Sequence, residues 1–138
     1  MIEIVLRGAP RGKERPRLTK GGHVYTPQKT RDYEAALKAA ATLTMGDAPP
    51  LEGPIALEID VRLPIPKSWP KKRREAAASN RLAPTSKPDF DNYAKTVDAL
   101  NQLVWIDDGQ VIDARIRKRY SDTPGMWIRV YSVGELFS

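Results

Sequence analysis

The stretch PIALEIDVRLPIP, residues 54–66, decides the fold class of this chain. Its apolar side chains alternate with mostly polar ones, and this period of two is typical of a β-strand with one buried face. The apolar positions are Ile55, Leu57, Ile59, Val61 and Leu63. A strand of this kind needs further strands beside it and a layer that covers its apolar face.

Three other segments predict strands, and between them lies material with helical periodicity. β-branched residues in alternation predict strands over residues 2–7, 110–120 and 125–134, the last two pairing as an antiparallel hairpin. Apolar residues at helical spacing, with a proline at the start, predict a helix over residues 27–45, and the basic insertion after residue 66 is expected to contain a short helix over residues 70–78. Prolines and glycines predict a long loop over residues 9–27.

A third predicted helix begins near Asp89, and its apolar stripe runs from Phe90 to Val104 so that it can pack on the sheet. The order of these elements predicts an α/β (α+β) domain. We expect a single small domain over residues 1–138, with one mixed β-sheet and helices packed on it.

Composition narrows the possible partners and chemistry. The chain of 138 residues has a formal net charge of +6 and no cysteine. The absence of cysteine excludes disulfides, zinc fingers and thiol catalysis. No apolar run is long enough for a membrane span and no leader is evident, so we expect a cytoplasmic protein without a membrane partner. The positive charge favours nucleic acid as a partner, although it also serves solubility.

The stretch KPDFDNYAKTVDAL, residues 87–100, gathers acids at the start of the third predicted helix. Asp89 and Asp91 stand where side chains accept hydrogen bonds from free N–H groups, and Lys95 follows one turn after Asp91. These residues have an ordinary structural interpretation as a capped helix with an ion pair. They also have the composition of a catalytic site.

The stretch WIDDGQVID, residues 105–113, is a second acidic group, which by itself predicts a turn before a strand. The short connection after the helix allows Asp108 to fold back toward Asp89 and Asp91. Three adjacent carboxylates repel one another unless they bind protons or a cation. Oxygen ligands without cysteine favour Mg²⁺, with Mn²⁺ as a substitute, and a basic chain favours a nucleic-acid phosphate as substrate. The reaction would be phosphodiester hydrolysis, with Lys95 stabilising charge or orienting water.

Basic residues cluster in two places that predict DNA contacts. One cluster lies in the loop after the first strand and consists of Arg11, Lys13, Arg15, Arg17 and Lys20. The other lies on one face of the strand 110–120 and consists of Arg115 and Arg117. These charges can neutralise phosphates, and binding would then weaken with salt. The alternative is that both are solvated faces.

Together, the residues of KPDFDNYAKTVDALNQLVWIDDGQV, 87–111, resemble the central motif of the RusA family of Holliday junction resolvases. Residues 12–34 and 63–75 resemble the phage-borne branch of that family. The resemblance implies a homodimeric, Mg²⁺-dependent endodeoxyribonuclease of DNA recombination and repair. Such an enzyme cuts four-way DNA junctions with paired symmetric nicks and needs no small-molecule cofactor.

Roles within the motif also follow from the resemblance. It assigns the metal-binding and catalytic acids to Asp89, Asp91 and Asp108, and the catalytic lysine to Lys95. Asp98 would orient Lys95, and Tyr93 replaces an aliphatic residue. Two alternatives stay open: a metal nuclease of another fold, in which the lysine would lie on a strand, and a non-catalytic basic DNA-binding module whose acids only cap and turn.

Overall fold

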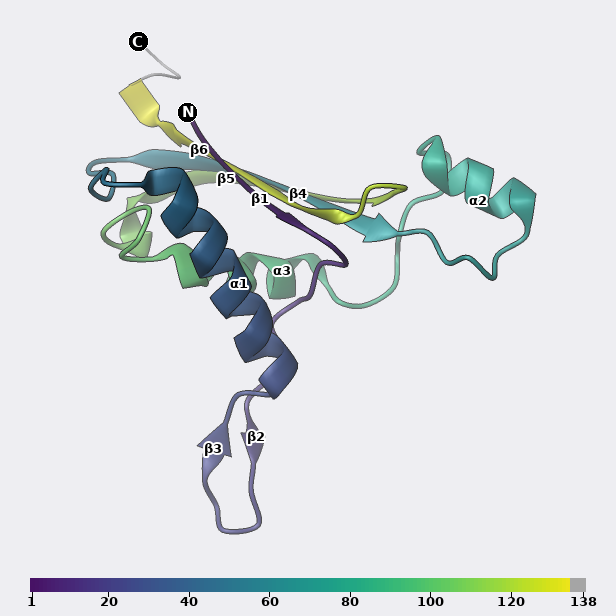
Figure 1. Ribbon diagram of the computed structural model, residues 1–138, viewed down its shortest axis with the longest axis horizontal. Helices are drawn as coiled ribbons and strands as arrows, with labels where there is room; N and C mark the ends of the chain where they lie inside the picture. Colours follow the sequence, from purple (N-terminus) through teal and green to yellow (C-terminus); the bar gives the residue numbers. More distant parts are fainter. Residues whose placement is uncertain (135–138) are drawn as a thin grey trace.

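The computed structural model describes residues 1–134, which form an α+β domain around one mixed sheet (Figure 1). The sheet has the order β1-β6-β4-β5. Its strands are β1 Ile2–Arg7, β4 Ile55–Pro64, β5 Val111–Ser121 and β6 Gly125–Ser132. β4 pairs antiparallel with β6 and parallel with β5, while β1 pairs antiparallel with β6. The predicted fold class is confirmed.

The predicted hairpin between residues 110–120 and 125–134 is wrong. Both strands form, but β4 lies between them, so that β5 and β6 are neighbours of β4 and not of each other. The short connection after Ser121 therefore steps over the end of β4. β4 takes the inner position as a strand that is buried on both faces at its start, where Ile55, Ala56 and Leu57 are all buried. A strand buried on both faces gains most from a neighbour at each edge.

Two of the predicted helices appear almost as expected, and the third is shorter. α1 covers Gln28–Met45 and α2 covers Lys71–Ala78, each preceded by a proline at its N-cap. α3 covers only Phe90–Val97 and continues as the 3₁₀ turn η1, Asp98–Leu100. Gln102 adopts a positive φ of 70°, which ends the helical path before Val104. The predicted apolar stripe is correct at Val97 and Leu100, whereas Phe90 is exposed.

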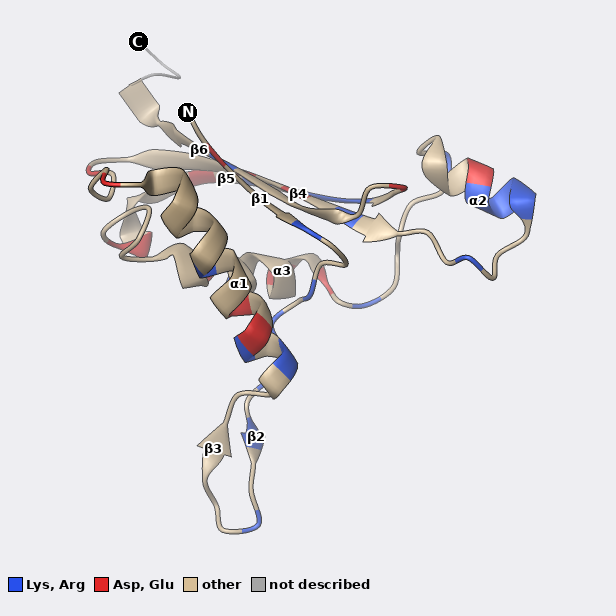
Figure 2. Ribbon diagram, in the orientation of Figure 1, with Lys and Arg blue, Asp and Glu red and all other residues tan. Residues whose placement is uncertain are grey.

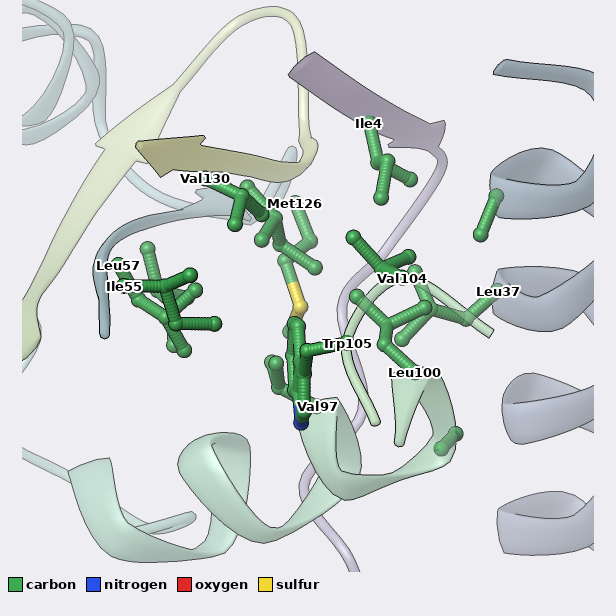
Figure 3. Close-up of a cluster of buried hydrophobic side chains, with 14 of the residues drawn as sticks. Ile4, Leu37, Ile55, Leu57, Val97, Leu100, Val104, Trp105, Met126 and Val130 are labelled. Carbon is green, nitrogen blue, oxygen red and sulfur yellow. The ribbon is translucent and has the colours of Figure 1, made fainter. Parts of the chain in front are cut away.

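The core lies between one face of the sheet and the helical layer of α1, α3 and η1. Figure 3 shows Trp105 between the sulfur of Met126 on the sheet and Val97 on α3. Trp105 is only 1% exposed. Burial of so large a side chain at this point ties the segment after α3 to the sheet.

Two parts of the chain project from this body (Figure 1). A small antiparallel hairpin of β2, Arg17–Leu18, and β3, Val24–Tyr25, forms an arm within the predicted loop. α2 stands at the far end of the sheet, where Trp69 packs edge-on against Tyr120 with ring centroids 5.3 Å apart. No helix within residues 1–134 has the length and apolar content of a membrane span.

Candidate functional site

A pocket of about 760 Å³ lies where the loop after β1 meets the start of α3. One wall is the segment 12–17, and the other is the turn that leads into α3 together with its first turns. The predicted site residues Asp89, Asp91 and Lys95 all line it, as do the predicted DNA contacts Lys13, Arg15 and Arg17. The structure thus brings acids and bases from distant parts of the sequence to one cavity.

The two walls are joined by hydrogen bonds to backbone carbonyl oxygens. The N–H of Lys13 donates to the carbonyl oxygen of Asn92 at 2.9 Å, and the buried hydroxyl of Thr96 donates to that of Arg11 at 3.1 Å. Gly12 lies against Pro88, and a Cβ added at Gly12 would be 2.8 Å from the Cβ of Pro88. A larger residue at position 12 would therefore separate the walls.

Lys118 of β5 supports the acid-bearing turn from behind. Its Nζ donates to the carbonyl oxygens of Ser86 at 2.9 Å and Pro88 at 3.0 Å, directly before Asp89. Sequence reasoning missed this residue. The sequence did contain a signal. Lys118 lies on the same face of the strand as the apolar residues Ile112, Ala114 and Ile116, where a charged residue is unexpected.

The acids at the start of α3 are available for a ligand. Asp89 occupies the N-cap position, yet its side chain makes no capping hydrogen bond. The Nζ of Lys95 lies 3.7 Å from Oδ2 of Asp91, and both side chains are about half exposed. An exposed pair of this kind adds little to stability. The expected capping role is therefore absent, which leaves both carboxylates facing solvent in the pocket.

Asp108 is positioned separately, by the turn that follows Trp105. Oδ1 of Asp108 accepts a hydrogen bond from Nε1 of Trp105 at 2.8 Å. The neighbouring Asp107 accepts from the N–H of Gly109. The side chain of Gln110 accepts from the N–H of Asp107 and donates to the carbonyl oxygens of Leu51 and Gly53, so it ties the turn to the segment before β4. Asp107 and Gln110 thus stabilise the turn, and Asp108 is the acid of this turn that hydrogen-bonds to the core residue Trp105.

The predicted convergence of three acids is not seen. Within residues 1–134, no three His, Asp or Glu side chains are placed to hold one metal ion, and Asp108 does not line the pocket of Asp89 and Asp91. Two carboxylates still suit Mg²⁺, which commonly binds one or two carboxylates and completes its shell with water and substrate phosphate. The donors at Asp89 and Asp91 fit this pattern.

Asp98 connects the two acidic groups electrostatically. Burial, followed by the neighbouring carboxylate of Asp108, raises the pKa of Asp98, while Lys13 and Lys95 act in the opposite direction. Glu34 of α1 contributes to the same rise, and its Oε1 lies 3.5 Å from Nζ of Lys13. Lys13 therefore contacts both the pocket and a second acidic group formed by Asp98 and Glu34. Glu34 was not among the residues predicted from the sequence.

The remaining predicted DNA contacts lie outside the pocket. Arg11 is exposed just before the pocket wall, and Lys20 lies at the tip of the β2–β3 arm. Arg115 and Arg117 lie on the face of the sheet opposite the helices, beside Glu58 and Asp60. Figure 2 shows basic residues along the loop after β1, on the arm and on α2.

Comparisons with known proteins place the chain in one family. Residues 7–131 match the family described as Endodeoxyribonuclease RusA, which spans nearly all of the chain. The chain is also similar to an uncharacterized protein, YqaN, of Bacillus subtilis (strain 168). The two are 36% identical over 134 residues, which cover 95% of this chain and 92% of that protein.

Proposed function

The chain belongs to the RusA endodeoxyribonuclease family, and from this premise we propose that it resolves four-way DNA junctions by Mg²⁺-dependent hydrolysis. The observation that carries the proposal is the pocket in which Asp89, Asp91 and Lys95 face the basic segment 13–17. A cavity that combines paired carboxylates with several cations suits a phosphodiester and an ion bound to it.

Each residue has a role that its position supports. Asp89 and Asp91 would hold Mg²⁺, which when bound polarises the scissile phosphate and lowers the pKa of a bound water. Lys95 lies beside Asp91 and would contact the same scissile phosphate. Its positive charge would offset the negative charge that grows on that phosphate in the transition state. Arg15 and Arg17 on the facing wall would hold the flanking phosphates.

Asp108 keeps the role that the family motif implies, as a third acid needed for cleavage. Its fixed orientation on Trp105 supports such a role. We also propose that the protein acts as a homodimer, because a four-way junction has near two-fold symmetry and its resolution needs two equivalent cuts.

The decisive experiment compares a synthetic four-way junction with a linear duplex of the same sequence, in Mg²⁺ and in EDTA. We expect paired nicks in the junction only, and only with Mg²⁺. Asp91→Asn should bind the junction as well as the native protein does, without cutting it. Asp47→Asn is the matched control, because Asp47 is an exposed acid of the turn after α1. Equal cutting of the duplex would overturn the proposed selectivity.

The two alternatives are separated from the proposal by the position of Lys95 and by the cleavage assay. In a nuclease of the restriction type the lysine lies on a strand, whereas Lys95 lies on α3. A non-catalytic DNA-binding module predicts that Asp91→Asn and the native protein behave alike, with no cleavage in any metal.

Lys95→Gln separates DNA binding from catalysis. We expect this variant to bind the junction as the native protein does and to cut it about 10²–10³-fold more slowly.

A further inference from the structure

β5 is an edge strand whose N-terminal half is open. Within residues 1–134 it pairs with β4 and with no other strand. Its residues 112–115 are all exposed, whereas its C-terminal half is flanked by the segment that contains Leu82 and Ala83. An open edge presents unpaired N–H and C=O groups and favours pairing with another strand.

One face of this open half is apolar. Ala114 and Ile116 lie opposite Leu57 and Ile59 of β4, so they continue the face of the sheet that carries the core. Ile112 lies on the same face and is 60% exposed. The apolar surface of the sheet thus extends beyond the helices that cover it, along a strip formed by Ile112, Ala114 and Ile116.

The other face carries opposite charges two positions apart. Asp113 and Arg115 are exposed, and neither forms an ion pair with another residue in the part of the chain that the structure describes. Other charges on this face are paired, as Arg119 is with Asp60 at 2.9 Å. Asp113 and Arg115 are therefore charges of opposite sign beside an apolar strip, on the half of β5 that no other described segment covers.

We propose that β5 pairs antiparallel with β5 of a second copy of this chain, with the two-fold axis at Ala114. In such a pair, residues equally far before and after the axis lie opposite each other on the same face. Ile112 then faces the partner's Ile116, and Asp113 faces the partner's Arg115. Each contact occurs twice by symmetry, so the strip is covered and both charges are neutralised.

Neighbouring registers lack this complementarity. An axis at Arg115 sets Arg115 against its own copy, and an axis at Asp113 does the same for that acid. A two-fold axis that passes between two residues pairs each odd-numbered residue with an even-numbered residue of the partner. Ile112 would then lie opposite a charged residue such as the partner's Arg115 or the partner's Arg117. Register is set by the pattern of the faces, and only the axis at Ala114 matches apolar with apolar and acid with base.

The pairing would place two pockets in a symmetric arrangement. Lys118, which holds the turn before Asp89, lies four residues from Ala114. The two copies of Lys118 would lie about 27 Å apart along the strands, at about 3.4 Å per residue. The inference rests on the proposed homodimer and not on the proposed cleavage, and it joins the two copies, each with its own pocket, through one continuous sheet.

Cysteine cross-linking tests the register directly, because the chain has no cysteine of its own. Ala114→Cys should form a covalent dimer on mild oxidation, since paired Cα atoms about 4.5–5.5 Å apart fit a disulfide. Ile112→Cys should not, because its two copies would lie about 14 Å apart. Leu43→Cys, an exposed position on α1, measures random collision. Cross-linking of Ala114→Cys no faster than Leu43→Cys would overturn the inference.

A charge exchange provides an independent test by sedimentation equilibrium. Asp113→Arg and Arg115→Asp each bring like charges together and should raise the dimer dissociation constant by about tenfold. The double exchange restores opposite charges and should recover most of the affinity. A native dimer that cuts junctions but whose dissociation constant is unchanged by both single exchanges would refute the inference alone. A β5 dimer that cuts no DNA would refute the proposed function alone.

Discussion

Trp105 donates a hydrogen bond from Nε1 to Oδ1 of Asp108 at 2.8 Å, so the largest of the fully buried side chains orients an acid at the surface. A hydrogen bond to a charged group stabilises by about 1.5–3 kcal/mol. The same contact ties the position of Asp108 to the packing of the core. A change at Trp105 is therefore expected to affect both stability and the site.

Asp108→Asn should abolish cleavage while the protein stays folded, because asparagine still accepts from Trp105 but carries no charge. Asp107→Asn is the matched control: it removes a charge from the same turn and keeps the acceptor for Gly109. We expect Asp107→Asn to cut normally. Cleavage of a four-way junction and a thermal unfolding curve measure the two effects. Equal activity of both variants would show that Asp108 is only structural.

Gly12→Ala should separate the walls of the pocket. The new Cβ would lie 2.8 Å from Pro88 and 3.1 Å from Asn92 at their Cβ atoms, so either the loop or the start of α3 must move. We expect a loss of about 1–3 kcal/mol in the free energy of unfolding and reduced cleavage. Gly21→Ala in the arm is the control, because its nearest neighbour is at 3.5 Å. Urea unfolding of both variants checks the prediction, which fails if they are equally stable.

Arg15→Ala should weaken DNA binding and reduce its salt dependence. Arg15 is exposed on the pocket wall, and loss of one phosphate contact lowers the slope of log K against log salt by about 1. Lys38→Ala on α1 removes the same charge from an exposed site outside the pocket. Fluorescence anisotropy over a salt series measures both slopes. An unchanged slope for Arg15→Ala would mean that its wall does not contact DNA.

Asp98→Asn should stabilise the protein at neutral pH but not in acid. Burial and Asp108 raise the pKa of Asp98, so its ionised form is less favourable in the folded state than in the unfolded chain. This destabilisation is complete above the raised pKa and vanishes below the ordinary aspartate value of about 3.9. Urea unfolding at pH 7 and near pH 3 gives the comparison. The same gain at both values would contradict an ionisation effect.

Local features of the sequence predicted local structure well. Alternation over residues 54–66 identified β4, and prolines at 27 and 70 located the starts of α1 and α2. These signals depend on backbone sterics and on the period of one element, which act within a few residues. The grouping of Asp89, Asp91 and Lys95 was predictable for the same reason, because one helix turn separates the last two.

Features that depend on which elements touch were not predictable in this way. Alternation in residues 110–120 showed two faces but not that β4 would lie between this strand and the next. The helical stripe from Phe90 to Val104 did not reveal that the helix ends at Val97. A period determines which face is buried, whereas the choice of neighbour depends on contacts distant in sequence.

By itself, the sequence determined the fold class, the family motif and the helical turn that carries Asp89, Asp91 and Lys95. Only the tertiary structure decided that the loop after β1 forms the facing wall, that Lys118 supports the acid-bearing turn, and that Trp105 holds Asp108 apart from that pocket. The physical reason is range. Spacing along the chain sets the geometry within an element, but packing around the buried Trp105 and β4 sets the geometry between elements.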